Sequence, residues 1–264
     1  ANMSVVITGG ADPAAGSALA KRLFGDWKAD GAAPVLPKSR AGAVLPPRTI
    51  VVDLPGAGQA AVLAAVRGVS RSSADYPSLL LANSVLGVGS NGRLFNEVRS
   101  KRALSYGAYS SMPARADAAL LSASAQTKNE TATEVAEIFL NEFKRLGAEP
   151  ITPDALAKRR AFLEGAYGRQ QETGGGYGAI VAGLILQGLQ PADALDYAKR
   201  LGAVTPAATN AIAAKNVTPE NASLIVVGDS AKFIDKLRAL RPDLVVIPAE
   251  KLDLESPTLG AEAR

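Results

Sequence analysis

The residue types that usually carry catalysis are scarce in this sequence. Its 264 residues include no histidine and no cysteine, so the chain has no imidazole to act as a base or zinc ligand and no thiolate nucleophile. It also contains neither Ser-x-x-Lys nor Gly-x-Ser-x-Gly, two patterns that activate a serine. Carboxylates remain, such as Glu134 and Glu137, but acids at helical spacing are typical of a solvated helix face. We therefore expect no catalysis by this chain alone.

A glycine pattern of another kind lies near the middle of the first half. Gly87, Gly89 and Gly92 spell G-x-G-x-x-G, which binds dinucleotides when a strand precedes it and a helix follows. Here the preceding residues look helical, because Leu79, Leu80, Asn83 and Leu86 fall at i, i+1, i+4 and i+7. The pattern therefore favours a glycine-rich connection between two helices, and we expect no nucleotide cofactor.

Arg99 and Tyr106 follow this loop, seven positions apart. By pattern alone, Arg99 belongs to the last turn of a surface helix, where cations oppose the negative end of the helix dipole. Tyr106 and Tyr109 are placed at the start of a strand, where half-buried tyrosines are common. Because the two tyrosines are three residues apart, their side chains are expected on opposite faces of that strand.

A longer string of residues around this pair resembles a known family. The string comprises Leu86-Gly87-Val88-Gly89, Arg93-Leu94-Phe95, Val98-Arg99 and Leu104-x-Tyr106, with further agreement at Gln170-x-Glu172-Thr173, Ala203-Val204-Thr205 and Val226-Val227-Gly228-Asp229. It resembles the C-terminal, metal-free half of the insulinase-type zinc peptidases, the family of pitrilysin and the mitochondrial processing peptidase. The agreement extends over nearly the whole chain.

The resemblance implies roles for individual residues. It implies that Arg99 binds a backbone carbonyl of the substrate and that Tyr106 donates to the oxyanion that develops during cleavage. It also implies that a loop lies beside the substrate cleft, and the residues of this loop are Gly87, Gly89, Ser90, Asn91 and Arg93. Where the family has Ser-Arg-Leu-Phe, this chain has Asn91-Gly92-Arg93-Leu94-Phe95, so the detailed geometry of the loop is left open.

The resemblance also implies what the chain lacks. In this family the other half carries an inverted zinc motif, H-x-x-E-H, and a distant glutamate, and the two halves close around a peptide. We therefore expect no metal and no other cofactor on this chain, zinc on a partner half or subunit, and a peptide as substrate. The alternative is a catalytically inactive scaffold, the role that core subunits of the respiratory complex with the same fold perform.

Composition excludes some other classes of protein. The net charge is +4, from 29 basic and 25 acidic residues, and no basic run is interleaved with aromatic residues, so no nucleic-acid partner is expected. No apolar run approaches the roughly 18 residues of a membrane span. The N-terminus lacks the basic start and apolar middle of a signal peptide. We expect a bacterial protein of the periplasm or the cytoplasm, with the periplasm favoured.

The two ends of the chain repeat one pattern. Met3–Leu23 and Ala222–Leu240 each read as a short β-branched run, a glycine turn and a helix, with Ser4 aligned to Ser223. Two such units can arise by chance in any α/β protein. The alternative is that each unit forms the end of a domain, as the duplicated halves of the family suggest. On that reading residues 1–25 form a strand and helix at the seam with a preceding half, residues 26–241 form the C-terminal domain, and residues 242–264 form a terminal strand and a polar tail.

Strands and helices are expected throughout the rest of the chain. The expected strands are 48–54, 59–66, 106–111, 118–127 and 224–227, and the expected helices are 13–24, 75–86, 90–101, 130–146, 152–171, 173–190, 192–201 and 205–215. Residues 25–47 are rich in Pro, Ala and Gly and are expected to form a long connection. Strand pairs followed by several helices predict an α+β fold with a largely antiparallel sheet covered by helices on one face.

Overall fold

The computed structural model describes residues 3–10, 12–28, 46–256 and 258–260. Its α-helices are α1 (Pro13–Phe24), α2 (Tyr76–Gly87), α3 (Arg93–Phe95), α4 (Ala132–Ala148), α5 (Pro153–Gln171), α6 (Gly174–Leu186), α7 (Tyr197–Gly202), α8 (Pro206–Asn216) and α9 (Ile234–Leu240). Its strands are β1 (Thr49–Asp53), β2 (Ala60–Arg67), β3 (Ala108–Ser111), β4 (Leu120–Thr127), β5 (Ser223–Gly228) and β6 (Val245–Pro248). Most of these bounds lie within a few residues of those expected from the sequence.

The strands form one six-stranded sheet in the order β3-β4-β2-β5-β1-β6. β4 pairs antiparallel with β3 and β2, and β2 pairs antiparallel with β5. β1 runs parallel to its two neighbours, β5 and β6, which are joined through α9 by the kind of helical crossover that parallel strands need. The predicted α+β class is confirmed, with a parallel section at one end of a largely antiparallel sheet.

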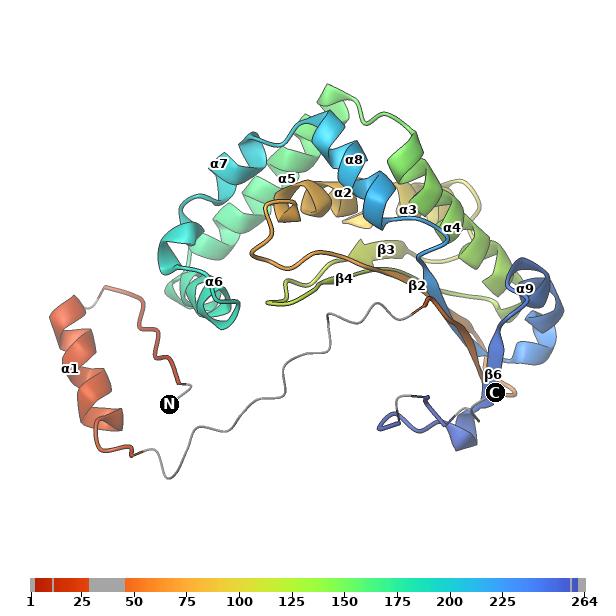
Figure 1. The fold of residues 1–264 in the computed structure, drawn as a ribbon, viewed down its shortest axis with the longest axis horizontal. Helices are drawn as coiled ribbons and strands as arrows, with labels where there is room; N and C mark the ends of the chain where they lie inside the picture. The colour runs from red at the N-terminus through yellow and green to blue at the C-terminus, as the bar shows by residue number, and fades with distance from the viewer. Residues whose placement is uncertain (1–2, 11, 29–45, 257, 261–264) are drawn as a thin grey trace.

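Helices cover one face of this sheet (Figure 1). In the described part of the chain the other face, which we call the open face, has no α-helix over β2 and β4, and its β1–β6 end is covered where Ile50, Val52 and Ile247 are buried with Leu252 and Leu259. On the covered face, α4 contacts β2 and β4, and α2 contacts β3. The side-chain alternation of the strands follows from this arrangement. In β3, for example, Ala108 and Ser110 are buried, whereas Tyr109 and Ser111 are exposed. The open face is therefore built from every second residue of each strand.

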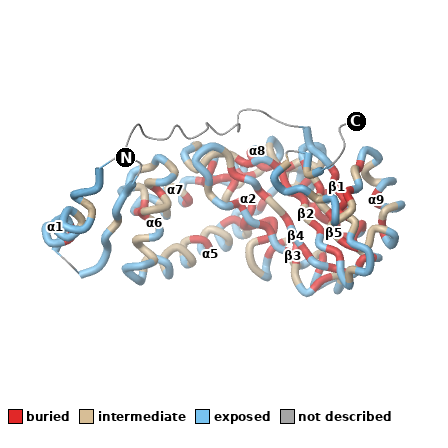
Figure 2. Tube along the Cα trace, turned by 90° about the horizontal axis from the view of Figure 1, so that it is seen from below, coloured by how far each residue is buried: buried red, intermediate tan, exposed pale blue. Residues whose placement is uncertain are grey.

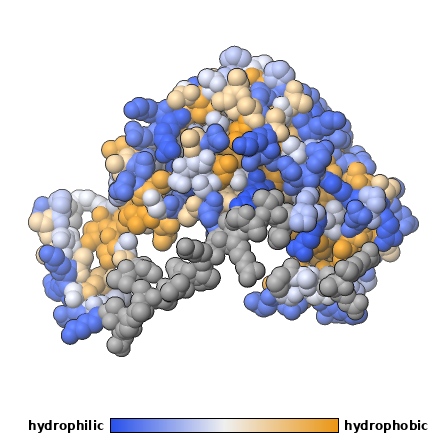
Figure 3. All heavy atoms as spheres, viewed as in Figure 1, coloured by the Kyte–Doolittle hydropathy of each residue, from blue (hydrophilic) through white to orange (hydrophobic). Residues whose placement is uncertain are grey.

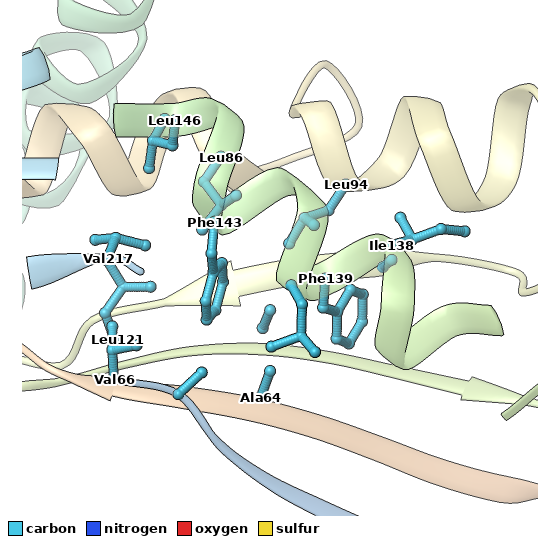
Figure 4. Packing of buried hydrophobic residues seen from close by; sticks show 14 of the residues in the cluster. Ala64, Val66, Leu86, Leu94, Leu121, Ile138, Phe139, Phe143, Leu146 and Val217 are labelled. Atoms are coloured by element: carbon cyan, nitrogen blue, oxygen red, sulfur yellow. The ribbon is translucent and has the colours of Figure 1, made fainter. Parts of the chain in front are cut away.

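The core between α4 and the sheet combines large and small side chains. Phe139 and Phe143 of α4 are fully buried and lie above Ala64 and Val66 of β2 and Leu121 of β4 (Figure 4). The small alanines on the strands leave space for the two aromatic rings, so the covered face packs closely with few aromatic residues. This packing fixes the strands that carry the open face.

Two sequence-based expectations near the candidate site are wrong. The helix expected to start at Ser90 or Asn91 begins at Arg93, and its N-cap is Gly92, which makes no side-chain capping bond. The strand expected from Tyr106 begins at Ala108. Each difference has its own local cause: the N–H of Gly92 donates to the carbonyl oxygen of Gly89 in a turn before the helix, and the Ser105 hydroxyl bonds to Gly107 in a turn before the strand.

The N-terminal segment lies apart from the sheet, beside α6 (Figures 1 and 2). The helix expected there is confirmed: Asp12 caps α1 by accepting a hydrogen bond from the backbone N–H of Ala15, and Pro13 is its first residue. The strand expected before α1 is not formed, because none of the described strands pairs with residues 3–8. A strand needs a hydrogen-bonded neighbour, and this segment has none in the described part of the chain.

Most of the connection expected over residues 25–47 lies outside the described residues. Of the helices that the structure describes, none combines the length and the apolar character that crossing a membrane requires.

Candidate functional site

Arg99 and Tyr106 lie in contact at the edge of the open sheet face. The Cζ atom of Arg99 is 5.1 Å from the centroid of the Tyr106 ring, which is within the range of a cation–π interaction. Both side chains are exposed, and Tyr106 is 86% exposed. The two residues that the sequence singled out are therefore neighbours in space, with the guanidinium and the phenol presented to the same side.

A π-helical turn positions Arg99. Asn96–Ser100 form this turn, and the backbone N–H of Lys101 donates to the carbonyl oxygen of Asn96 at 2.9 Å. The turn ends at Ala103, whose φ of 52° is the left-handed conformation, and the N–H of Leu104 donates to the oxygen of Val98 at 2.9 Å. Single π-turns inside helices are rare and are frequent at functional sites.

Buried and charged side chains hold this turn in place. Leu94 and Val98 are fully buried, so the opposite side of the turn, which carries Arg99, faces outward. Glu97 accepts hydrogen bonds from Lys101 and from Arg102, each at 2.6 Å. Partial burial raises the pKa of Glu97, but these two hydrogen bonds outweigh it and leave the pKa below its usual value. Glu97 is therefore charged at neutral pH and pairs with Lys101 and Arg102, whereas the Arg99 guanidinium lies over the Tyr106 ring.

A tight turn positions Tyr106. The Ser105 hydroxyl donates to the carbonyl oxygen of Gly107 at 2.8 Å and accepts from the N–H of Gly107 at 3.2 Å. Thr127 Oγ1 of β4 donates to the carbonyl oxygen of Leu104 at 2.6 Å. The Ser105–Gly107 bonds close the turn around Tyr106, and the bond to Leu104 ties its N-terminal side to β4. The Tyr106 side chain projects into solvent.

Tyr109 faces the same hollow as Tyr106, so the expectation that the two tyrosines project to opposite faces is wrong. The reason is that Tyr106 precedes β3, and the alternation of a strand does not apply to it. The Tyr109 ring lies on the open face, 5.8 Å from the ring of Phe95. It also lies over Gly107, where a Cβ atom would come within 2.6 Å of the ring. Glycine at position 107 therefore gives the Tyr109 ring its space.

The hollow beside this pair lies on the open sheet face and has a volume of about 760 Å³. Its floor is formed by alternate residues of three strands: Ala61, Leu63, Ser124, Gln126, Ile225 and Val227. Arg99, Tyr106 and Tyr109 lie on its rim, together with Lys128. The lining, drawn from the described residues, includes two cations and no acidic residue. A surface of this kind suits a ligand that presents carbonyl or carboxylate oxygens over an apolar body.

Two residues of the expected substrate loop line a different hollow. Asn91 and Arg93 line a second hollow of about 620 Å³ together with residues of α5, not the hollow with Arg99 and Tyr106. Gly89 adopts a φ of +73°, as glycine tolerates, and Ser90 is exposed. The structure thus brings Arg99 and Tyr106 together but separates Asn91 and Arg93 from them.

Close packing fixes the ends of this loop. Gly87 is buried, and a Cβ atom there would lie 2.5 Å from the backbone nitrogen of Ser110; a Cβ atom on Gly92 would lie 2.6 Å from the Cα atom of Gly87. The glycines therefore allow α2, α3 and β3 to approach one another. Arg159 of α5 donates to the carbonyl oxygens of Val88 and Asn91, and burial lowers its pKa. No local pattern in the sequence pointed to Arg159, because its partners are backbone atoms about seventy positions away.

The residues present do not fit a zinc ion. The whole chain has no histidine and no cysteine, and the described residues contain no group of three or more acidic, histidine or cysteine side chains placed to hold a metal. Carboxylates alone rarely hold zinc, which usually takes nitrogen and sulfur ligands.

Comparison with known proteins identifies the family. The family model described as the peptidase M16 inactive domain matches residues 1–163. The chain belongs to this family, and the resemblance to the metal-free half of insulinase-type zinc peptidases is confirmed.

The curated relatives of this chain are described as zinc proteases. An uncharacterized zinc protease of Streptomyces coelicolor is 29% identical over 171 residues, which is 64% of this chain and 37% of the relative. An uncharacterized zinc protease of Mycobacterium tuberculosis is 28% identical over 163 residues, 62% of this chain and 37% of the relative. The chain thus spans little more than a third of the length of these relatives.

Solved structures share the fold at low sequence identity. The peptidase M16 inactive domain of Pseudomonas fluorescens superposes with a TM-score of 0.63 at 22% identity, covering 69% of this chain and 44% of that one. A protease of Helicobacter pylori gives 0.71 at 17% identity, covering 84% and 53%. The periplasmic protease PqqL of Escherichia coli gives 0.66 at 18% identity, covering 83% and 24%. These likenesses establish the fold.

Proposed function

We propose that this chain acts as the metal-free half of an insulinase-type zinc endopeptidase and that Arg99 and Tyr106 bind the peptide opposite a zinc site on another half or subunit. The observation that carries the proposal is the contact between the Arg99 guanidinium and the Tyr106 ring, at 5.1 Å, on the rim of the hollow over the open sheet face. The family supports the same role, since its members include zinc proteases.

The two side chains supply complementary chemistry. The planar guanidinium of Arg99 can donate two hydrogen bonds to a backbone carbonyl of an extended peptide. The Tyr106 hydroxyl can donate to the negative charge that develops on the scissile carbonyl oxygen. Zinc on the partner half would lower the pKa of its bound water and polarise that carbonyl from the other side.

The exposure of Tyr106 explains why this half is not expected to work alone. A hydroxyl in a water-filled hollow competes with solvent, and a donor stabilises an oxyanion strongly only where water is excluded. At 86% exposure, Tyr106 reaches such an environment only when a second surface closes over it. The open sheet face beside it offers the area for that closure (Figure 1).

The test is to assemble the chain with the half that carries H-x-x-E-H and to follow cleavage of a short unstructured peptide. We expect the assembled pair to cleave the peptide and the isolated chain to cleave none and to bind no stoichiometric zinc. The double variant Arg99→Ala/Tyr106→Phe should abolish most of the activity of the pair without preventing assembly. If the assembled pair is equally active with the double variant, the chain is a scaffold, and the proposed role of the two residues is wrong.

A further inference from the structure

Lys128 is a charged residue of the hollow to which the proposed function gives no role. It directly follows β4 and continues the outward alternation of Ser124 and Gln126, so its side chain lies on the open face. It is exposed, and it lines the hollow together with Arg99 and Tyr106. Lys128 is therefore in reach of any peptide that the pair binds.

The ammonium group of Lys128 takes part in no ion pair within the described part of the chain. Glu130, two positions further on, forms its ion pair with Lys232, at 3.6 Å. A backbone hydrogen bond and then Lys232 lower the pKa of Glu130, and Lys128 adds the smallest effect. The positive charge of Lys128 is thus left without a close counterpart.

The rim of the hollow therefore carries two positive charges that face no negative one. Its second cation, Arg99, lies over the Tyr106 ring, and the described residues that line the hollow include no carboxylate. Charge of one sign in a concave surface attracts ligands of the opposite sign and repels those of the same sign. The hollow suits a ligand with a negative group near this rim.

The positive rim and the apolar floor lie at different ends of the hollow. Thr127 at the end of β4 donates to the carbonyl oxygen of Leu104, and this bond places the turn that carries Tyr106 next to Lys128. The positive end of the hollow is therefore the end at which the scissile carbonyl is proposed to lie.

The apolar end lies further back along β4. In the register of the sheet, Leu63 lies between Ser124 and Ile225, and Tyr109 pairs with Ser124 on its other side. Ser124 is four residues before Lys128, which at the rise of a strand is about 13 Å. An extended peptide of the same rise covers this distance in about four residues.

We propose that Lys128 determines specificity by selecting peptides that have an acidic side chain close to the cleaved bond. The inference rests on the proposed function, which places the scissile carbonyl at Tyr106. The Lys128 ammonium would form an ion pair with the aspartate or glutamate carboxylate of the peptide, and this pair would strengthen when a second surface closes over the hollow and excludes water. The row at Leu63 and Ile225 would take an apolar side chain about four residues away. A basic side chain near the cleaved bond would meet two positive charges and is disfavoured.

The test compares short unstructured peptides that are identical except for Glu, Gln or Lys at one position near the cleaved bond, with each such position taken in turn. In the complex with the zinc-bearing half, we expect kcat/KM for the Glu peptide to exceed that for the Lys peptide by about fivefold or more at one position, with the Gln peptide between them. The variant Lys128→Glu should reverse this order, and added salt should reduce the difference. An order that Lys128→Glu leaves unchanged would overturn the inference.

Two further variants separate the position of the charge from its presence. Lys144→Glu is the matched control, because it reverses the same charge at an exposed residue of α4, on the other side of the sheet, where Figure 3 shows a largely hydrophilic surface. It should keep the wild-type order, and Lys128→Arg, which keeps the charge, should keep it as well. Equal effects of Lys128→Glu and Lys144→Glu would show that net charge alone selects the peptide. The unfolding midpoint of each variant checks that the sheet and its helices remain intact.

Equilibrium binding of the same peptides to the isolated chain and to the complex distinguishes this inference from the proposed function. Tighter binding of the Glu peptide that Lys128→Glu reverses, without any cleavage, would support the role of Lys128 and count against the proposed function alone. Equal binding and equal cleavage of the three peptides would overturn the role of Lys128 and leave that of Arg99 and Tyr106 in place.

Discussion

At the scale of single residues, the candidate site depends on Arg99 and Tyr106, which are seven positions apart in the sequence and in contact in space. Arg99 and Tyr106 meet because the chain reverses direction at Ala103 and again at Ser105–Gly107. The pairing was predictable from the string of residues around them. The side on which Tyr109 lies was not, because its position depends on where β3 begins and on the space that Gly107 leaves for its ring.

Replacement of Arg99 tests substrate binding. In an active complex, Arg99→Ala should raise KM about tenfold or more and change kcat much less, because a guanidinium on a peptide carbonyl stabilises the bound ground state and the transition state alike. Arg102→Ala is the matched control, since it removes the same charge from a neighbouring residue that pairs with Glu97. Steady-state kinetics provide the measurement. Equal effects of the two variants on KM would show that only net charge matters.

A buried carboxylate predicts how stability depends on pH. Glu142 of α4 is buried beside Arg145, and burial raises its pKa above the usual 4.5 although Arg145 opposes the shift. The folded state therefore holds this proton more tightly than the unfolded state, so the contribution of Glu142 to stability is full below pH 4.5 and is lost as the pH rises through the folded pKa. Two other carboxylates, Glu97 and Glu149, face the same guanidinium at 3.7 Å and 2.7 Å.

The variant Glu142→Gln keeps the neutral form at every pH. Its stability relative to the wild type should therefore increase as the pH rises from below 4.5 to neutral. Urea unfolding of both proteins across this range is the measurement. A difference that stays constant with pH, or that decreases as the pH rises, would show that Glu142 is not held in its neutral form by burial.

At the scale of elements, the turn between α3 and β3 is the part that sequence patterns described least well. A helix was predicted over this stretch, and the apolar spacing of Leu94 and Val98 is consistent with one. The chain after the π-helical turn Asn96–Ser100 is held at Leu104, whose N–H donates to Val98 and whose carbonyl oxygen accepts from Thr127 of β4. The second of these bonds requires β4 to be in place. Local spacing therefore predicted the element but not its last turn.

The left-handed residue in this turn gives a direct test of its geometry. Ala103 has a φ of 52°, a conformation that costs a non-glycine residue roughly 1–2 kcal/mol. Ala103→Gly should therefore raise the free energy of unfolding by about 0.5–1 kcal/mol. Ala157→Gly, at an exposed position inside α5, should lower it by a similar amount. Chemical denaturation measures both, and a destabilising Ala103→Gly would contradict the left-handed turn.

At the scale of the whole molecule, the sequence predicted the class of fold because strand and helix periodicity alternate clearly along the chain. It did not predict the order of the strands, which depends on β5, at position 223 and beyond, returning to lie between β1 and β2. The sequence also did not predict that Asn91 and Arg93 line a different hollow from the Arg99–Tyr106 pair. It follows from the packing of Gly87 against Gly92 and from the bonds of Arg159 to the loop.

The most direct test of the account is the catalytic constant of Tyr106→Phe in the complex with the zinc-bearing half. We predict a fall in kcat of about 10²–10³-fold with little change in KM, because the hydroxyl is proposed to donate to charge that exists only in the transition state. Tyr167→Phe is the control, since its hydroxyl bonds the Ala194 carbonyl away from the hollow, and it should keep the wild-type kcat. If Tyr106→Phe also keeps the wild-type kcat, Tyr106 takes no part in catalysis and the central claim is contradicted.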